Sequence, residues 1–309
     1  MSGFKKAVRQ QAKLRLALSG PSGAGKTYGA LKIAKGLGGR IAVIDTERGA
    51  ASLYSHLVDF DTMELNAPFE PERFIDAIHQ AEKAKYDILI IDSITHEWNG
   101  SGGCLEINDT IAKVSYKGNT WAAWNDTTPR HRAFLDAILQ SPLHIIATMR
   151  AKTETAQEGR NVVKLGMKDE QRDGTEYEFT IVLNLTHETH HAKAGKDRSE
   201  LFKQPHIISE DTGKRLLAWL NDGAPMPPEP AAPPSVNPPS VKPDHVLFGQ
   251  MMKFMENSRD MAELEPHYKA FWTSREKFTA EQIAEGNALK DRLKAKFAAE
   301  AAAKVSEPK

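Results

Sequence analysis

Gly20-Pro21-Ser22-Gly23-Ala24-Gly25-Lys26-Thr27 matches the phosphate-loop pattern G-x-x-x-x-G-K-[ST] in full and decides the fold. Before this stretch, Leu14, Leu16 and Leu18 alternate with other residues, which predicts a strand. After it, residues 28–37 carry apolar side chains at helical spacing and end at two glycines, which predicts a helix. Strand, glycine-rich loop and helix in this order predict a nucleoside triphosphate site. The alternative is a glycine-rich turn that holds no ligand.

The residues of the loop have separate expected roles. Its glycines let backbone N–H groups and the helix N-terminus point at phosphates. Lys26 is expected to reach the β- and γ-phosphates, and the Thr27 hydroxyl is expected to bind Mg²⁺. The predicted nucleotide contacts are Gly20, Pro21, Ser22, Gly23, Ala24, Gly25, Lys26, Thr27 and Tyr28.

Two further apolar runs end in acids. Residues 86–91 predict a strand buried on both faces of a parallel sheet, and Asp92 at its end can hold the hydration shell of Mg²⁺. Residues 40–44 lead to Asp45-Thr46-Glu47, where Glu47 can orient or deprotonate the water that attacks the γ-phosphate. The alternative for Glu47 is a cap on the following helix. With the phosphate loop, these carboxylates predict hydrolysis rather than static binding.

This order of parts resembles the RecA-like recombinases over about residues 12–220, on Lys26 and Thr27, then Glu47, then Asp92 and Ser93. It is most similar to the short phage-encoded RecA-like ATPases of recombination and single-strand annealing. The resemblance implies ATP as the nucleotide, single-stranded DNA as a partner and a homo-oligomer. RecA-like proteins usually end the fourth core strand with Asn-Gln, whereas this chain has Arg150 there. Arg150 is therefore the candidate γ-phosphate sensor.

In RecA-like proteins, single-stranded DNA binds to the loops after the metal-Asp strand and after the sensor strand. The matching stretches here are residues 99–125 and 152–175, both long and polar. The first interleaves basic and aromatic residues, which suits single strands. Its leading contact candidates are Lys113, Tyr116 and Lys117, whereas Trp121 and Trp124 can instead pack on the core. The second is charge-balanced, so its case depends on the resemblance.

Two further candidates concern assembly. A hairpin turn is expected at residues 194–196, and RecA-like filaments present basic residues beyond it to the neighbouring subunit's nucleotide. Lys196 and Arg198 are thus candidates for acting in trans, with a solvated basic turn as the alternative. Phe4 and Ala7 match the spacing of the Phe-x-x-Ala segment with which eukaryotic RecA-like recombinases polymerise.

The chain is expected to have four parts: a basic N-terminal arm at residues 1–11, a RecA-like ATPase domain at 12–222, a proline-rich linker at 223–243 and a helical hairpin at 244–309. The arm can follow a phosphate backbone or be a solvated tail. The fold class expected for the ATPase domain is α/β, with a mostly parallel sheet flanked by helices. One of these helices is expected to begin after Thr128, with Pro129 as its first residue. Capping boxes at Asp260–Glu263 and Thr279–Gln282 predict helices in the C-terminal module, which suits a protein partner.

Composition limits the possible partners, location and cysteine chemistry of the protein. The formal net charge is zero, which by itself gives no evidence for nucleic acid. The chain has no apolar run of membrane-spanning length and no signal-peptide core at its N-terminus, so the expected location is the bacterial host cytoplasm. Cys104 is the only cysteine, which excludes intrachain disulfides and zinc sites built from two or more cysteines.

The sequence therefore predicts an ATP-hydrolysing, single-stranded-DNA-binding protein of phage recombination, annealing or repair, with DNA-stimulated ATPase activity and Mg²⁺ as cofactor. The alternative is an ATP-driven loader or assembly switch that acts on a protein partner through the C-terminal helices. A small-molecule kinase is a third and weaker interpretation, because the polar loops are not rich in arginine.

Overall fold

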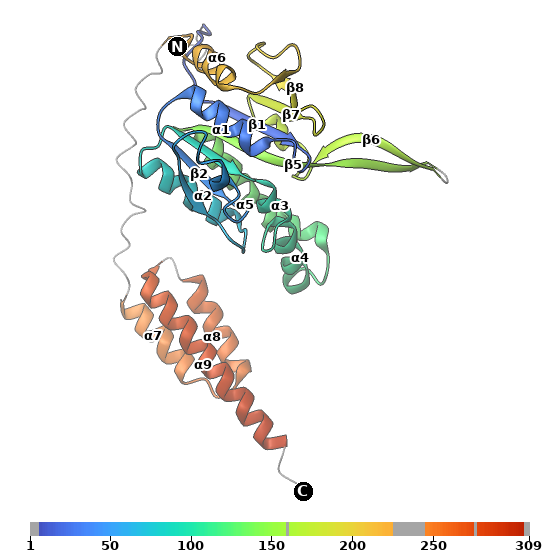
Figure 1. The fold of residues 1–309 in the computed structure, drawn as a ribbon. Helices are drawn as coiled ribbons and strands as arrows, with labels where there is room; N and C mark the ends of the chain where they lie inside the picture. Colours follow the sequence, from blue (N-terminus) through green and yellow to red (C-terminus); the bar gives the residue numbers. More distant parts are fainter. Residues whose placement is uncertain (1–5, 159–160, 225–244, 275–276, 306–309) are drawn as a thin grey trace. The chain divides into compact units, whose positions relative to one another are not determined.

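The computed structural model describes residues 6–158, 161–224, 245–274 and 277–305 (Figure 1). The chain divides into two compact units between residues 226 and 227. Phe4 and nearly all of the predicted proline-rich linker lie outside the described residues. Within the described ranges, every helix is too short or too polar to span a bilayer.

The first unit is built on one mixed sheet. Its strands follow the order β3-β2-β4-β5-β1-β7-β8-β9, and the six strands from β3 to β7 run parallel. Strands β8 and β9 add antiparallel pairs at one edge, and β6 pairs antiparallel with β5. The bounds are β1 (Arg15–Gly20), β2 (Ile41–Asp45), β3 (Asp61–Glu64), β4 (Ile88–Asp92), β5 (His144–Glu158), β6 (Asn161–Asp169), β7 (Ile181–Leu185), β8 (His191–Asp197) and β9 (His206–Ile207).

Helices cover both faces of this sheet, which confirms the predicted α/β architecture (Figure 1). Helices α1 and α6 pack on one face, and α2 and α5 pack on the other. The bounds are α1 (Lys26–Leu37), α2 (Pro71–Lys83), α3 (Thr95–Asn99), α4 (Cys104–Ser115), α5 (Thr120–Gln140) and α6 (Glu210–Asn221), with short 3-10 turns at Ala51–Tyr54 and Thr175–Tyr177.

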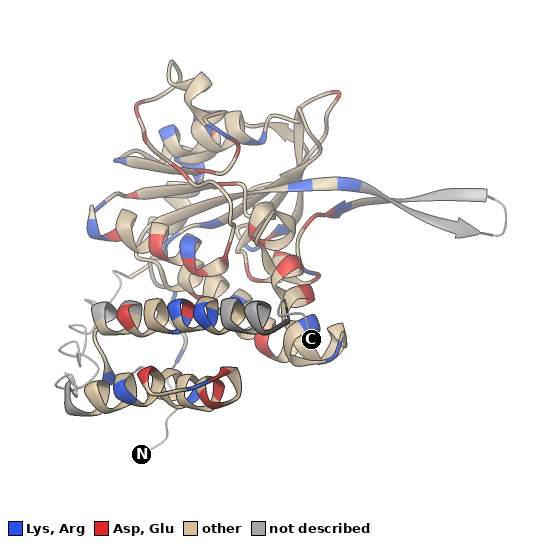
Figure 2. Cartoon of the chain, turned by 90° about the horizontal axis from the view of Figure 1, so that it is seen from below, with Lys and Arg blue, Asp and Glu red and all other residues tan. Residues whose placement is uncertain are grey.

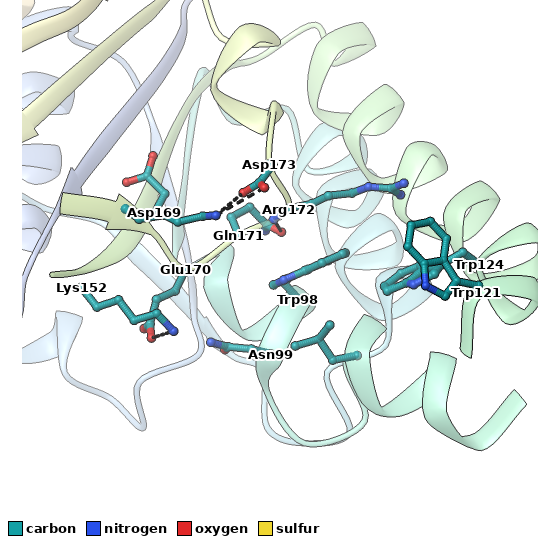
Figure 3. A pocket seen from close by; sticks show the side chains of 12 residues that line it. Trp98, Asn99, Trp121, Trp124, Lys152, Asp169, Glu170, Gln171, Arg172 and Asp173 are labelled. Atoms are coloured by element: carbon teal, nitrogen blue, oxygen red, sulfur yellow. Dashed lines mark hydrogen bonds and ion pairs between the residues drawn. The ribbon is translucent and has the colours of Figure 1, made fainter. Parts of the chain in front are cut away.

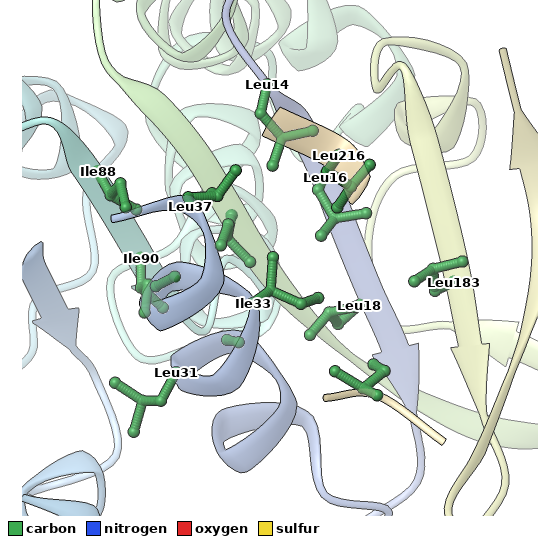
Figure 4. Packing of buried hydrophobic residues seen from close by; sticks show 14 of the residues in the cluster. Leu14, Leu16, Leu18, Leu31, Ile33, Leu37, Ile88, Ile90, Leu183 and Leu216 are labelled. Carbon is green, nitrogen blue, oxygen red and sulfur yellow. The ribbon is translucent and has the colours of Figure 1, made fainter. Parts of the chain in front are cut away.

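Alternation along the central strands decides which core each side chain joins. Leu16 and Leu18 of β1 pack with α1 and α6 (Figure 4), whereas Ala17 joins the opposite core against α2 and α5. Ile88 and Ile90 of β4 face the first core in the same way. Burying each such leucine or isoleucine side chain contributes roughly 1.5–3 kcal/mol. The strands are therefore apolar on both faces, as their continuous apolar runs predict.

Two glycines bring α1 and α6 into backbone contact. A Cβ atom at Gly36 would lie 2.0 Å from the carbonyl oxygen of Glu210, and one at Gly213 would lie 2.2 Å from that of Ile33. Any larger residue at either position would push the helices apart. Since α1 begins at Lys26, this contact also fixes the position of the phosphate loop.

The predicted loop at residues 99–125 is largely helical. Helix α4 occupies its first half, and α5 begins at Thr120 rather than after Thr128. The Asn119 side chain caps α5 by accepting a hydrogen bond from the N–H of Ala122 at 3.1 Å. Pro129, predicted to be the first residue of the helix, lies inside it.

The predicted loop at residues 152–175 is mostly a β-hairpin. Strand β5 leaves the parallel sheet and continues to Glu158, pairing with β6 from Ala151 opposite Asp169. Figure 1 shows this hairpin projecting from the first unit. Its sequence does not predict strands because a two-stranded ribbon outside the core needs no buried apolar face.

The prediction of a hairpin turn at residues 194–196 is wrong. These residues lie inside β8, and the turn between β7 and β8 spans residues 186–190 instead. Lys196 pairs with Val182, and Ala194 pairs with Leu183, so Gly195 is the extra residue of a bulge. A glycine inside a strand marks such a bulge as readily as a turn.

The described part of the N-terminal arm docks onto α6. Arg9 forms an ion pair with Asp222 at 3.2 Å, and its guanidinium lies 5.2 Å from the ring centre of Trp219. The backbone of Gln11 donates to the carbonyl of Ala224 at 2.9 Å. Arg15, one of the basic residues before the first acid, is 7 % exposed and donates to the carbonyls of Leu139 and Leu143. Arg15 is therefore part of the core.

The described residues of the second unit form three helices rather than the predicted hairpin: α7 (His245–Glu256), α8 (Met261–Thr273) and α9 (Ala280–Val305). The predicted capping box at Thr279–Gln282 is confirmed, since Gln282 N–H donates to Thr279 and Thr279 N–H donates to the Gln282 side chain. Asp260 caps α8 by accepting from Glu263 N–H, but the Glu263 side chain accepts from the N–H of Arg259 rather than that of Asp260. The Phe271 ring covers Gly286, where a Cβ atom would lie 2.1 Å from Cζ. This unit has its own apolar core.

Candidate nucleotide site and the adjoining tryptophan pocket

The phosphate loop has the backbone conformation that the motif requires. Gly23 and Gly25 adopt φ of 77° and 89°, which favours glycine. Lys26 begins α1, and its Nζ donates to the carbonyls of Gly20 at 2.9 Å and Pro21 at 2.8 Å. Burial lowers the pKa of the Lys26 ammonium, while the charges of Asp92 and Glu47 oppose that shift. The ammonium is thus held inside the loop that would surround the phosphates.

Asp92 lies at the end of β4 beside this loop and is 2 % exposed. Its Oδ2 accepts from Thr27 Oγ1 at 2.6 Å, and its Oδ1 accepts from the hydroxyl of Thr148 on β5. Burial raises the pKa of the Asp92 carboxyl, and the two hydrogen bonds oppose that shift. A hydroxyl and a carboxylate in contact supply the oxygen ligands that Mg²⁺ prefers, so these residues fit the ion.

Glu47 is held at the same sheet edge by a turn that Asp45 organises. The buried Asp45 carboxylate accepts from the backbone N–H of Glu47 at 2.6 Å and of Ala51 at 2.9 Å. Glu47 Oε1 in turn accepts from Nε and Nη2 of Arg150 at 3.1 and 2.8 Å. Both side chains are partly exposed, so this ion pair faces the space above the loop.

The structure brings most of the predicted site residues around one cavity of about 460 Å³. Tyr54 and Glu170, which were not predicted, also line it. Gly20 and Pro21 line a neighbouring cavity, and Ala24 lines another. The predicted residues that line the central cavity are Ser22, Gly23, Gly25, Lys26, Thr27, Tyr28, Glu47, Asp92 and Arg150.

A mostly apolar cavity of about 400 Å³ adjoins the phosphate loop. The rings of Tyr28 and Tyr54 meet edge to face there, with centroids 6.0 Å apart. Ile208 and His190 line it as well, and His190 Nδ1 lies 3.3 Å from the carbonyl oxygen of Ala24. This cavity is the right size and polarity for a nucleotide base. Tyr28 is a predicted nucleotide contact, whereas Tyr54, His190 and Ile208 were not predicted.

A second set of hydrogen bonds joins the turn after Asp92 to the turn that carries Glu47. Thr46 Oγ1 lies 2.6 Å from His96 Nδ1 and accepts from the backbone N–H of Ser93 at 2.8 Å. The His96 ring stacks on Phe69 with centroids 4.9 Å apart. Burial, followed by the charge of Arg150, lowers the pKa of His96. Hydrogen bonds therefore connect the end of β2, which leads to Glu47, with the end of β4, which carries Asp92.

A cavity of about 640 Å³ lies next to the nucleotide site, and we call it the tryptophan pocket (Figure 3). Trp98 of α3 and Trp124 of α5 stack with centroids 5.4 Å apart and planes at 15°. The Arg172 guanidinium lies 6.0 and 5.5 Å from these two ring centres. Trp121 is 87 % exposed at the rim. The lining residues are Trp98, Asn99, Leu105, Trp121, Trp124, Lys152, Lys168, Asp169, Glu170, Gln171, Arg172 and Asp173.

The predicted DNA contacts do not line this pocket. Lys113, Tyr116 and Lys117 lie at the end of α4, where Tyr116 donates its hydroxyl hydrogen to Asp126 at 3.0 Å. Trp98, Trp121 and Trp124 line the pocket instead. The high exposure of Trp121 argues against a packing role for that residue. Trp98, directly downstream of the Asp92 strand, was missed because helical spacing alone does not separate a core tryptophan from a surface one.

Glu170 forms a wall between the nucleotide cavity and the tryptophan pocket, since it lines both. Its backbone N–H donates to the carbonyl of Arg150 at 2.7 Å. Its carboxylate pairs with Lys152 Nζ at 3.5 Å (Figure 3). Ser19, at the end of β1, donates its hydroxyl hydrogen to the adjacent Asp169. Hydrogen bonds and an ion pair therefore join the base of the β5–β6 hairpin to residues that border both cavities.

The two candidates for acting in trans lie away from this chain's own nucleotide cavity. Lys196 Nζ donates to the carbonyl of Tyr177 and lies 5.9 Å from the centre of that ring. Burial, followed by the charge of Arg198, lowers the pKa of Lys196. Arg198 itself is exposed.

Charged residues of both signs are interspersed over the first unit (Figure 2). The described base of the β5–β6 hairpin carries Lys152 and Lys168, each paired with an acid: Lys152 with Glu170, and Lys168 with Asp173 at 3.0 Å. The pocket thus combines cations and rings without a uniformly basic surface.

Comparison with protein-family models gives one match, described as an AAA domain, over residues 12–221. That match covers more than half of the chain. A comparison with curated proteins finds no match.

Proposed function

This chain belongs to the AAA domain family, and from that premise we propose that its ATP hydrolysis is coupled to single-stranded DNA held in the tryptophan pocket. Membership of the family makes the chain a P-loop ATPase that binds and hydrolyses ATP. The coupling, the DNA and the roles of individual residues are what we add.

The hydrolytic roles follow from the strand ends. Thr27 and Asp92 would hold Mg²⁺, which neutralises charge on the phosphates when bound. Lys26 would contact the β- and γ-phosphates. Glu47, presented by the Asp45 turn, would orient the attacking water and accept its proton.

Arg150 would report the presence of the γ-phosphate. Its guanidinium is paired with Glu47 Oε1, and a phosphate anion competes for the same N–H donors. Drawing Arg150 toward the phosphate would release the Glu47 oxygen for the water. Arg150 in this way replaces the Asn-Gln pair that RecA-like proteins carry at the end of this strand.

The observation that carries the DNA proposal is the stacked pair Trp98–Trp124 with Arg172 over it. Aromatic rings and guanidinium planes bind unstacked bases, and lysines such as Lys152 contact the backbone. Duplex DNA keeps its bases paired and stacked, so a pocket of this kind selects single strands. The shared wall at Glu170 gives the two ligands a direct structural connection.

The wider role that we propose is phage DNA recombination, annealing or repair by a homo-oligomer. Its support is the resemblance to RecA-like proteins, together with the position of Lys196 and Arg198 away from their own nucleotide cavity. In an assembly, these cations would approach the nucleotide of the next subunit.

The test is ATP hydrolysis with and without a single-stranded DNA oligonucleotide at one fixed salt concentration. We expect stimulation by DNA in the wild type and loss of all hydrolysis in Lys26→Ala. A variant combining Trp121→Ala with Arg172→Gln should keep basal hydrolysis and lose the stimulation. Hydrolysis that ignores DNA in the wild type would contradict the proposed coupling while leaving the ATPase intact.

The alternative is a loader whose C-terminal unit docks a protein. Among the described residues of that unit, three large apolar side chains are exposed: Phe254 at 57 %, Trp272 at 42 % and Met261 at 41 %. Deleting residues 244–309 distinguishes the two functions. A loader would lose its partner and keep basal hydrolysis, whereas a DNA-coupled ATPase would keep DNA stimulation.

A further inference from the structure

Three ligating side chains of different chemistry meet inside the first unit, away from the nucleotide cavity. Glu97 of α3, Cys104 of α4 and His131 of α5 are 0 %, 0 % and 1 % exposed. The thiol of Cys104 lies 3.0 Å from Glu97 Oε1, and His131 Nδ1 lies 3.0 and 3.1 Å from the two Glu97 oxygens. One ligand atom from each residue lies within 4.8 Å of the other two.

Hydrogen bonds within this cluster do not remove the cost of burying its charges. With a neutral imidazole, the thiol and the ring both donate to an ionised Glu97, and one negative charge stays in the interior. With a protonated ring, the charge is balanced, but the imidazolium, the carboxylate and the thiol are then all buried away from water. An unpaired charge and an ion pair without water are both costly to bury.

We propose that Glu97, Cys104 and His131 bind one Zn²⁺ ion. A carboxylate, a thiolate and a neutral imidazole bring two negative charges, which balance the ion. Sulfur and nitrogen together favour zinc over the hard cations Mg²⁺ and Ca²⁺. On binding, the Cys104 proton leaves for solvent as the zinc–sulfur bond forms.

The spacing fits a single ion after small movements. Zinc bonds of about 2.0–2.3 Å in tetrahedral geometry place neighbouring ligand atoms roughly 3.3–3.8 Å apart. The two observed contacts of 3.0 Å need to open by about half an ångström, and ligand atoms as far apart as 4.8 Å need to close by about one ångström, both within the reach of side-chain rotation. Among the described residues, no further His, Cys, Asp or Glu joins the group. Both Glu97 oxygens face His131, so the carboxylate can bind through the two of them.

The ion would have a structural role. Its ligands come from α3, α4 and α5. Helices α3 and α5 carry the three tryptophans of the tryptophan pocket, and α4 contributes Leu105 to the pocket lining. The His131 ring lies 5.3 Å from the ring of Trp98, so the cluster is directly beneath the pocket. A zinc ion would tie the helices together there, whatever the pocket binds.

The first experiment uses Co²⁺ as a probe on the full-length protein after dialysis against a chelator, with Mg²⁺ in excess. We expect one equivalent of Co²⁺ to give a thiolate-to-cobalt charge-transfer band, which one equivalent of Zn²⁺ removes. A cobalt ion bound at Thr27 and Asp92 would have oxygen ligands and no such band. Absence of the band in the wild type would overturn the proposal, and this result does not depend on any variant folding.

The second experiment measures zinc content after gel filtration. The wild type should retain about one zinc per chain, and Cys104→Ser and His131→Gln should weaken zinc binding by more than about tenfold. His79→Gln, at an exposed position on α2, is the matched control and should retain the metal. Equal zinc in wild type, Cys104→Ser and His131→Gln would place the metal elsewhere and overturn the proposal.

Discussion

The nucleotide site and the tryptophan pocket share a wall, yet their residues come together in different ways. Lys26 and Thr27 belong to one contiguous motif, and Asp92 and Glu47 follow buried strands of a parallel sheet. The tryptophan pocket takes residues from α3, α5 and the β5–β6 hairpin, which no motif connects. Chemistry attached to strand ends can be predicted from sequence, whereas chemistry assembled by helix packing needs the structure.

The two regions also differ in how firmly they are built. Asp92 is 2 % exposed and bonded to two threonines, whereas Trp121 is 87 % exposed at the pocket rim. Changes in the first region should affect chemistry and stability together. Changes at the rim of the second should affect ligand binding alone.

The largest effect is expected from Glu47→Gln. Removing a general base should lower the rate of ATP hydrolysis by about 10²–10⁴-fold with little change in ATP affinity. Steady-state hydrolysis and nucleotide binding measure the two quantities. Glu200→Gln, an exposed surface position, is the control and should behave as the wild type. Near-normal hydrolysis in Glu47→Gln would show that another residue activates the water.

The next largest effect is expected from Trp121→Ala, which should weaken binding of single-stranded DNA. Loss of one base–aromatic stack costs roughly 1–3 kcal/mol, or about 5- to 150-fold in affinity. Fluorescence anisotropy of a labelled oligonucleotide measures it, with Trp272→Ala in the second unit as the matched control. If both variants bind DNA as the wild type does, the pocket has another ligand.

A smaller effect is expected from Glu170→Gln at the shared wall. The change keeps the shape of the side chain but removes its ion pair with Lys152. Basal hydrolysis should stay near the wild-type rate, while stimulation by DNA should fall by about fivefold, equivalent to about 1 kcal/mol of coupling. Equal losses of basal and stimulated rates would instead place Glu170 in the hydrolytic site.

The smallest effect is expected on stability, from Asp92→Asn measured with chelator and without nucleotide. The folded-state pKa of Asp92 is raised, chiefly by burial, so the folded state holds a proton that the unfolded state loses as pH rises. At neutral pH the charged carboxylate therefore destabilises the fold. Asn should raise Tm by about 2–4 °C at pH 7.

The gain from Asp92→Asn should shrink as pH falls, because Asp92 itself becomes neutral. Thermal unfolding at several pH values checks the sign. A variant that is less stable than the wild type at neutral pH would show that the two threonine hydrogen bonds outweigh the cost of burial.

Parallel-sheet geometry explains why much of the nucleotide site could be predicted. Apolar runs such as residues 40–44 and 86–91 are typical of strands buried in a parallel sheet, and the carboxyl ends of such strands meet at one edge. Thr148 could not be predicted as a partner of Asp92, because nothing local distinguishes it from other buried threonines. The Tyr28–Tyr54 contact joins a helix and a 3-10 turn, so it too depends on tertiary packing.

The errors have local physical causes. Pro129 in α5 and Gly195 in β8 are residues that usually end an element, but here longer-range packing continues the helix and the strand through them. The hairpin strands beyond Ala151 leave the parallel sheet, and their sequence carries no apolar period that would predict strands. In the first unit, each of these errors lies outside the parallel part of the sheet.

The alternation of side chains along strand β5 links the two cavities. Thr148, Arg150 and Lys152 are two residues apart and so share one face of the strand, where they contact Asp92, Glu47 and Glu170 in turn. Inserting or deleting a single residue among them would turn the following side chains to the opposite face. The irregularity in the pairing of β5 with β6 comes later, between Glu154 and Thr155. Insertions and deletions are thus tolerable in the outer hairpin. Between residues 148 and 152 the number of residues must stay the same, because otherwise the side chains would no longer face the two cavities.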